Sequence, residues 1–201
     1  MNEEIWKGEF GDEYTDRNEK VNDTDIRSDF WYEVLRNCDN PWDKPGTLLE
    51  VGANIGRNLS TISLSFPDVH LAGLEPNESA RNKLQNTADE IVEGTATDIQ
   101  LPDESKDLVF TCGVLIHIPP EELLKACSEI YRVSKNWIVT VEYYSRHLQE
   151  IPYHGRDNML WKRDYGRYWL KHFPSLEPIA CGFAWKPLTG LDDLTWWIFR
   201  K

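Results

Sequence analysis

Short apolar runs alternate with amphipathic helical patterns along most of the chain, from residue 45 onward. The runs are apolar on consecutive positions, as expected for strands that are buried on both faces of a parallel sheet. They cover residues 47–52, 71–75, 90–94, 107–113 and 136–142. This alternation predicts an α/β fold, with a doubly wound, mostly parallel sheet and helices on both faces.

Two later runs, 178–185 and 194–200, are joined by a short turn that contains Pro187 and Gly190. They predict an antiparallel hairpin, which brings the sheet to seven strands. We expect one domain over residues 1–201, because this length suits a single α/β domain. Its parts are an N-terminal helical cap or lid at 1–45, a core at 46–142, a substrate-side insertion at 143–175 and the hairpin at 176–201.

The formal net charge of -12 over 201 residues repels polyanions, so we expect no nucleic-acid partner and favour a small-molecule substrate. The chain begins without the basic and apolar segments of a signal peptide and has no run of eighteen apolar residues. Its four cysteines are widely spaced, which favours buried thiols in a reducing compartment. A cytoplasmic protein without a membrane partner or metal is therefore expected, and its oligomeric state is left open.

The turn after the first predicted strand, residues 50–56, has glycines at Gly52 and Gly56 and Asn54 between them. In a doubly wound sheet, ligands bind beyond the carboxyl ends of the strands, where such a turn allows close backbone approach. Glu75 follows about twenty residues later, at the end of the second strand, where a carboxylate accepts both ribose hydroxyls. After the third strand, Asp98 is placed to accept an adenine amino hydrogen while Ile99 packs against the ring.

Together these segments resemble the class I S-adenosylmethionine-dependent methyltransferases over roughly residues 47–142. The resemblance rests on Glu50-Val-Gly-Ala-Asn-Ile-Gly56, Gly73-Leu-Glu-Pro-Asn77, Thr97-Asp-Ile99 and residues 107–119. It implies the Rossmann-like methyltransferase fold, with S-adenosylmethionine as cofactor and the end of the fourth strand facing the transferred methyl. The residues that it assigns to the cofactor are Glu50, Gly52, Asn54, Gly56, Asn58, Glu75, Pro76, Asp98, Ile99 and Cys112.

Three further features concern the ends of the cofactor and the substrate. Aromatic residues at helical spacing in the N-terminal segment predict a lid, from which Tyr14 and Arg17 would reach the methionine carboxylate; a helix docked by its aromatic stripe is the alternative. His117, just past the fourth strand, is the candidate general base if the acceptor is a hydroxyl or a protonated amine, unless its role is structural.

Basic residues gather at His154, Arg156, Lys162 and Arg163. They suit a phosphate or carboxylate on the substrate, although they could equally balance nearby acids on the surface. With residues 6–18, 113–120 and 162–166, they make the chain similar to methylases associated with pseudaminic acid biosynthesis. This narrower resemblance implies a modified sugar or a nucleotide-sugar as acceptor.

The sequence therefore predicts an O- or N-methyltransferase that acts on a small polar, anionic acceptor. Two alternatives stay open: an NAD-dependent oxidoreductase, which would use the same turn and Glu75, and a noncatalytic module that binds the cofactor without transferring a methyl.

Overall fold

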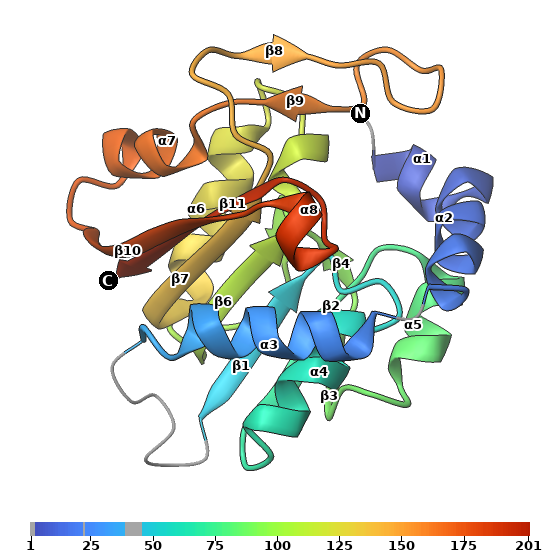
Figure 1. Cartoon of the computed structure of the whole chain (residues 1–201), viewed down its shortest axis with the longest axis horizontal. Coiled ribbons are helices and arrows are strands. Elements are labelled where there is room, and N and C mark those ends of the chain that lie inside the picture. The colour runs from blue at the N-terminus through green and yellow to red at the C-terminus, as the bar shows by residue number, and fades with distance from the viewer. Residues whose placement is uncertain (1–2, 22, 39–45) are drawn as a thin grey trace.

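The computed structural model describes residues 3–21, 23–38 and 46–201. Its main sheet has seven strands in the order β10-β11-β7-β6-β1-β2-β3, so the first strand in the chain lies near the centre. β1 pairs in parallel with β2 and β6, β2 pairs with β3, and β6 pairs with β7. β11 joins β7 antiparallel and β10 closes the edge as its hairpin partner, which confirms the predicted α/β fold (Figure 1).

The strands lie close to the predicted runs. The main sheet consists of β1 (Thr47–Val51), β2 (His70–Leu74), β3 (Glu90–Val92), β6 (Lys106–Cys112), β7 (Ser134–Glu142), β10 (Glu177–Ala184) and β11 (Leu194–Arg200). Two small ribbons, which the sequence did not predict, are β4 (Gly94–Thr95) with β5 (Asp98–Ile99) and β8 (Gln149–Glu150) with β9 (Trp161–Lys162).

The helices are α1 (Glu3–Lys7), α2 (Glu9–Glu19), α3 (Thr24–Leu35), α4 (Arg57–Ser65), α5 (Glu78–Leu84), α6 (Leu123–Val133), α7 (Tyr165–His172) and α8 (Lys186–Thr189), with a 3₁₀ turn η1 (Leu115–His117). α7 begins at Tyr165, because Trp161 and Lys162 form β9 and Asp164 caps the helix by accepting from Arg167 N at 2.8 Å. None of the helices within the described residues is long and apolar enough to cross a membrane.

Alternation along each strand divides the core between the two faces of the sheet. In β1, Leu48 packs with Trp31 of α3, whereas Leu49 packs on the other face with Ile130 of α6. Each of these side chains is almost fully buried. Since side chains alternate along a strand, Glu50 lies on the same face as Leu48, toward α3 and α4. This places a carboxyl group inside the sheet, next to the turn that follows β1.

The N-terminal helices pack across the ends of the strands, beside α5 (Figure 1). Gly8 separates α1 from α2, and yet Trp6 still meets Phe10 and Tyr14 edge to face, with ring centroids 5.2 and 5.4 Å apart. Lys83 of α5 forms ion pairs with two acids of α2. The predicted boundary at residue 45 falls on residues 39–45, which lie outside the described ranges.

Candidate functional site

The turn after β1 is held open by three residues with positive φ. Gly52 (φ 76°), Asn54 (φ 48°) and Gly56 (φ 80°) take the left-handed conformation, which glycine and asparagine tolerate best. The N–H groups of Gly52 and Ala53 both donate to Leu74 O, at 2.8 and 2.9 Å, which ties the turn to the end of β2. A Cβ at Gly52 would come within 2.6 Å of Val114 Cγ2. The backbone therefore approaches the β6 end closely, with Gly56 leading into α4.

Three neighbouring cavities open at this edge of the sheet, and all three are lined by Gly52. The largest, about 290 Å³, lies on the α3 and α4 side; we call it the tail cavity. The second, about 100 Å³, is lined by Glu75 and Pro76, and the third, about 80 Å³, lies between Val51, Leu74 and residues 95–97. They form a row across the carboxyl ends of β1, β2 and β6, where a doubly wound sheet binds its ligand.

Glu50 lines the tail cavity although only 1% of it is exposed. Its Oε1 accepts from Asn58 Nδ2 at 2.6 Å, while Oε2 has no hydrogen-bond partner among the described residues. Burial raises the pKa of Glu50 to about 8, against the opposing effects of the Asn58 hydrogen bond and the Arg27 charge. A buried carboxyl without a complete set of partners costs free energy, and a strongly perturbed carboxyl in a cavity is a candidate ligand site.

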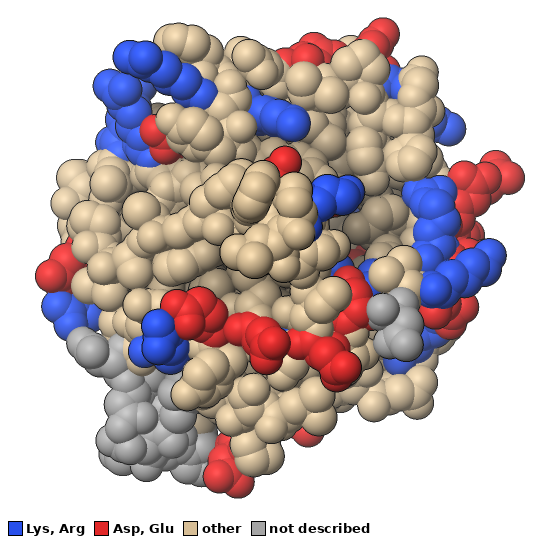
Figure 2. Space-filling view, viewed as in Figure 1, with Lys and Arg blue, Asp and Glu red and all other residues tan. Residues whose placement is uncertain are grey.

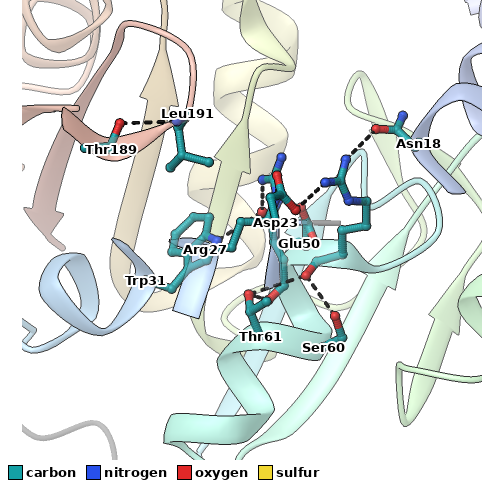
Figure 3. A network of polar contacts seen from close by, with 11 residues as sticks. Asn18, Asp23, Arg27, Trp31, Glu50, Ser60, Thr61, Thr189 and Leu191 are labelled. Carbon is teal, nitrogen blue, oxygen red and sulfur yellow. Dashed lines mark hydrogen bonds and ion pairs between the residues drawn. The ribbon is translucent and has the colours of Figure 1, made fainter. Parts of the chain in front are cut away.

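Two arginines border the same cavity, and both are positioned by Asp23 at the start of α3. Arg27 donates from Nε to Asp23 at 2.7 Å and from Nη1 to Asn58 Oδ1 at 2.8 Å. Arg57 donates to the other Asp23 oxygen and to Asn18 Oδ1 of α2. Figure 3 shows this network gathered directly over Glu50. The cavity thus presents two guanidinium groups and the carboxyl groups of Glu50, Asp23 and Asp192, and Asp23 is bound to both arginines.

Glu75 directly follows β2, lines the second cavity and is 6% exposed. Its two oxygens accept from the backbone N–H groups of Asn54, at 2.7 Å, and Asn77, at 2.9 Å. Burial raises its pKa, and the two backbone hydrogen bonds oppose the rise. Because each carboxylate oxygen has two acceptor sites, one on each is left for a ligand hydroxyl.

The third acidic position, Asp98, does not join this row. Its side chain is exposed and accepts from Gln100 Nε2 at 2.7 Å, since the β4–β5 ribbon turns it outward. Ile99 is 2% exposed and packs in the core. Thr95, Ala96 and Thr97 line the third cavity instead. This geometry therefore does not direct the Asp98 carboxylate toward an adenine at the strand ends. The prediction placed it there because the sequence pattern gave no sign of the short β4–β5 ribbon.

The end of β6 forms the common wall of the first two cavities, through Cys112 and Gly113. Burial raises the pKa of the Cys112 thiol to about 12, so the sulfur stays protonated. Behind it, the fully buried Glu142 accepts from Thr111 Oγ1 at 2.9 Å and from the backbone N–H groups of residues 114–116 at 3.1 to 3.3 Å. Glu142, which the sequence did not single out, fixes the loop that carries Val114 and Ile116 into the site.

Of the two lid residues expected to contact the cofactor, Tyr14 reaches the row and Arg17 does not. Tyr14 lines the second cavity together with Trp6. Arg17 is exposed, 4.0 Å from Glu13, with its guanidinium over the rings of Phe10 and Tyr14. The arginines that line the tail cavity, where they could bind a ligand carboxylate, are Arg27 and Arg57. Arg57 could have been suspected from its place directly after the glycine turn, but Arg27 is brought in only by the packing of α3.

His117 lines the second and third cavities, and its Nδ1 donates to Met159 O at 2.6 Å. Burial lowers its pKa to about 4, against the opposing effect of that hydrogen bond. The ring lies among Trp6 and Tyr153, with centroids 4.8 and 4.9 Å away. A neutral histidine of such low basicity suits packing against the lid better than proton abstraction near neutral pH.

The predicted basic cluster is dispersed in the structure. Arg163 lies over the ring of Tyr168, and the exposed Arg156 lies over Phe10 of the lid. His154 is exposed at a φ of 48°, close to Tyr153. Only Lys162 is directed to the site, with Nζ 4.8 Å from the ring centre of Tyr143, which lines the tail cavity.

The far wall of the tail cavity comes from the start of the predicted substrate-side insertion and from the hairpin connection, in which the sequence singled out none of the residues that line the cavity. Tyr143 follows β7, and Gly190, Leu191 and Asp192 follow α8 in the connection between β10 and β11. The Tyr143 hydroxyl donates to Asp192 Oδ2 at 2.8 Å, so the two segments are joined across the cavity mouth. Figure 2 shows the surface hollowed between α8 and α2, above the acidic side chains along α3.

Comparisons with known proteins agree with this geometry. Residues 49–137 match the family described as methyltransferase domain. No curated protein matches the sequence. Among solved structures, magnesium protoporphyrin IX methyltransferase from Synechocystis with bound S-adenosylmethionine is similar with a TM-score of 0.74 and 12% identity, covering 100% of this chain and 97% of that one. The 1,6-didemethyltoxoflavin-N1-methyltransferase of Burkholderia thailandensis gives 0.71 and 13%, covering 98% and 87%.

A third similar structure, a SAM-dependent methyltransferase from Leishmania major, has a TM-score of 0.67 and 15% identity, covering 89% of this chain and 72% of that one. At these identities the likeness shows the fold, which is that of the class I methyltransferases. Together with the domain match, it supports the broader of the two resemblances. The narrower one, to methylases associated with pseudaminic acid biosynthesis, has no counterpart among these matches.

Proposed function

We propose that this protein is an S-adenosylmethionine-dependent methyltransferase that acts on a small polar acceptor. The observation that carries the proposal is Glu50, whose buried Oε2 has no hydrogen-bond partner in the part of the chain that the structure describes, in a cavity that also presents Arg27 and Arg57. A ligand end with one ammonium and one carboxylate complements this set of charges, and S-adenosylmethionine ends in that pair. A nicotinamide cofactor has no such end, which favours the methyltransferase over the oxidoreductase.

The residues of the row fit the rest of the same cofactor. Glu50 would receive the ammonium, while Arg27 and Arg57 would bind the carboxylate. The free acceptor sites of Glu75 would take the ribose hydroxyls, as they do in doubly wound nucleotide sites. The apolar third cavity, between Val51 and Leu74, would take the adenine.

When bound, the cofactor supplies a methyl group on a positively charged sulfur, which needs little acid or base assistance. The chain's contribution is alignment, which by itself accounts for a large part of the rate of such reactions. Gly52 allows close approach of the backbone, the Cys112 and Gly113 end of β6 forms the wall, and Glu142 holds that wall in place. Trp6 and Tyr14 cover the second cavity and keep water out.

The acceptor class that we propose is a modified sugar or a nucleotide-sugar that carries a negative charge. Lys162, over the ring of Tyr143, and Lys186, which donates to Asp192 at 2.9 Å, each contact a residue that lines the tail cavity and would supply positive charge beside it. The reaction would take place in a reducing cytoplasm, with residues 1–201 acting as one domain. Cys112, Cys127 and Cys181 are free thiols, which supports this location.

The test is transfer of labelled methyl from S-adenosylmethionine to a panel of sugars, amino sugars and nucleotide-sugars. We expect transfer to at least one member of the panel, with a large loss of rate in Glu50→Gln. Glu33→Gln, which alters an exposed acid of α3 outside the cavity, serves as the matched control and should keep the wild-type rate. Tight cofactor binding without transfer to any acceptor would instead identify a noncatalytic binding module.

A further inference from the structure

Part of the tail cavity remains after the proposed cofactor residues are assigned. Its far wall consists of Tyr143 directly after β7, Leu191 and Asp192 in the β10–β11 connection, and Leu194 at the start of β11. Cys112 and Gly113 at the end of β6 line the same cavity. The wall combines apolar side chains with one carboxylate, a composition typical of a subsite for a small ligand.

Asp192 is held in a defined position at this wall. Its Oδ2 accepts from the Tyr143 hydroxyl at 2.8 Å, and its Oδ1 accepts from Lys186 Nζ at 2.9 Å. Burial by itself would raise its pKa, but the hydrogen bonds from Lys186 and Tyr143 outweigh that effect and hold the pKa below its usual value. The carboxylate is thus ionised, and two of its four acceptor sites remain for a ligand.

The connection that carries Asp192 is itself fixed in place. Gly190 takes a φ of 72°, and a Cβ there would come within 3.0 Å of Ile26 Cδ1 of α3. Leu191 is 6% exposed, which anchors the segment in the protein. The hydrogen bond from Tyr143 then joins this segment to the end of β7. Asp192 is therefore preorganised at the wall opposite the turn after β1.

We propose that Asp192, positioned by Tyr143, binds the nucleophilic group of the methyl acceptor, and that this group is a hydroxyl or an amine that donates a hydrogen bond. The inference rests on the proposed function, because the wall faces a transferred methyl only if S-adenosylmethionine occupies the row of cavities. Asp192 orients the acceptor, and its pKa is too low for an efficient general base. The anionic part of the acceptor would lie outward, toward Lys162.

The acceptor is unidentified, so the test uses two cofactor analogues as probes. S-adenosylhomocysteine lacks the methyl group, whereas sinefungin carries an amine-bearing carbon in place of the methyl-bearing sulfur. A protonated amine at that position would meet Asp192. The measured quantity is the association constant of sinefungin divided by that of S-adenosylhomocysteine. We expect this affinity ratio to fall about three- to tenfold in Asp192→Asn, the scale of one partly exposed charged contact. S-adenosylhomocysteine alone should bind within about twofold of wild type.

Tyr143→Phe keeps the carboxylate but removes the hydroxyl that positions it, so the ratio should fall by a smaller factor. Asp193→Asn is the matched control: Asp193 Oδ1 accepts from Lys186 N, an interaction that asparagine preserves, and the ratio should stay at the wild-type value. An unchanged ratio in both Asp192→Asn and Tyr143→Phe would overturn the inference while leaving the proposed function intact. Failure of the wild-type protein to bind either analogue would overturn the proposed function, and this inference with it.

Discussion

The buried carboxyl of Glu50 makes a prediction that links cofactor binding to a proton. With a pKa of about 8 in the free protein, Glu50 is protonated in about nine of ten molecules at pH 7. An ammonium group requires the ionised form, because only that form provides the opposite charge. Binding of S-adenosylhomocysteine at pH 7 should therefore release close to one proton per site.

The same reasoning gives the pH dependence of the affinity. The competent, ionised fraction rises about tenfold for each pH unit below 8, so the dissociation constant should fall about tenfold from pH 6 to pH 7. This corresponds to about 1.4 kcal/mol per unit. The dependence should flatten as the pH approaches 8.

Isothermal titration calorimetry measures the released proton directly, from the observed enthalpy in buffers of different ionisation enthalpy. Glu50→Gln should abolish the release, flatten the pH dependence and weaken binding at pH 8 by about 2 kcal/mol, the scale of a hydrogen bond between charged groups. Glu33→Gln, the exposed control, should behave as the wild type does. Proton release that persists in Glu50→Gln, or an affinity independent of pH between 6 and 7, would refute the assignment of Glu50 to the ammonium.

Three further predictions concern stability and binding. Because the folded-state pKa of Glu50 is raised from 4.5 to about 8, the free energy of unfolding of the unliganded protein should fall as the pH rises through this window; Glu50→Gln should lessen that fall, which chemical denaturation at pH 5 and pH 8 would measure. His117, with its pKa lowered to about 4, should show no NMR titration between pH 5.5 and 8, and a midpoint near 6.5 would contradict its burial. As the pH falls from 6.5 to 4, this histidine takes up a proton in the unfolded state but not in the folded state. The free energy of unfolding should therefore fall by up to about 3 kcal/mol over that range. Glu75→Ala should weaken the binding of S-adenosylhomocysteine by more than about 1 kcal/mol. An unchanged affinity in a calorimetric titration would show that Glu75 does not bind the ribose.

The core of the fold was predictable because its signals are local. Each buried strand is a short apolar run, and the two glycines and the asparagine between Glu50 and Gly56 indicate a turn with positive φ angles. Parallel pairing then places the ends of β1, β2 and β6 together, so Glu75 and Gly52 had to meet at one edge. This explains why the meeting of Gly52 and Glu75 at one edge of the sheet could be inferred from spacing alone.

The remaining part of the site depends on contacts between segments that are distant in the sequence. Arg27 reaches Asn58 across 31 positions and Tyr143 reaches Asp192 across 49, and no periodicity connects such pairs. Conversely, Arg156 and Arg163 are close in sequence but separate in the structure, because each lies over a different ring. Asp98 was misplaced for a third reason: the two-residue ribbon that turns it outward is too short to leave a pattern.

The cofactor assignment is tested most directly by calorimetry of the purified protein with S-adenosylhomocysteine and, separately, with NADH. Under this assignment we expect one binding site for S-adenosylhomocysteine, weakened in both Glu50→Gln and Glu75→Ala, and no heat from NADH. Micromolar binding of NADH without heat from S-adenosylhomocysteine would contradict it, and would make the row of cavities a dinucleotide site.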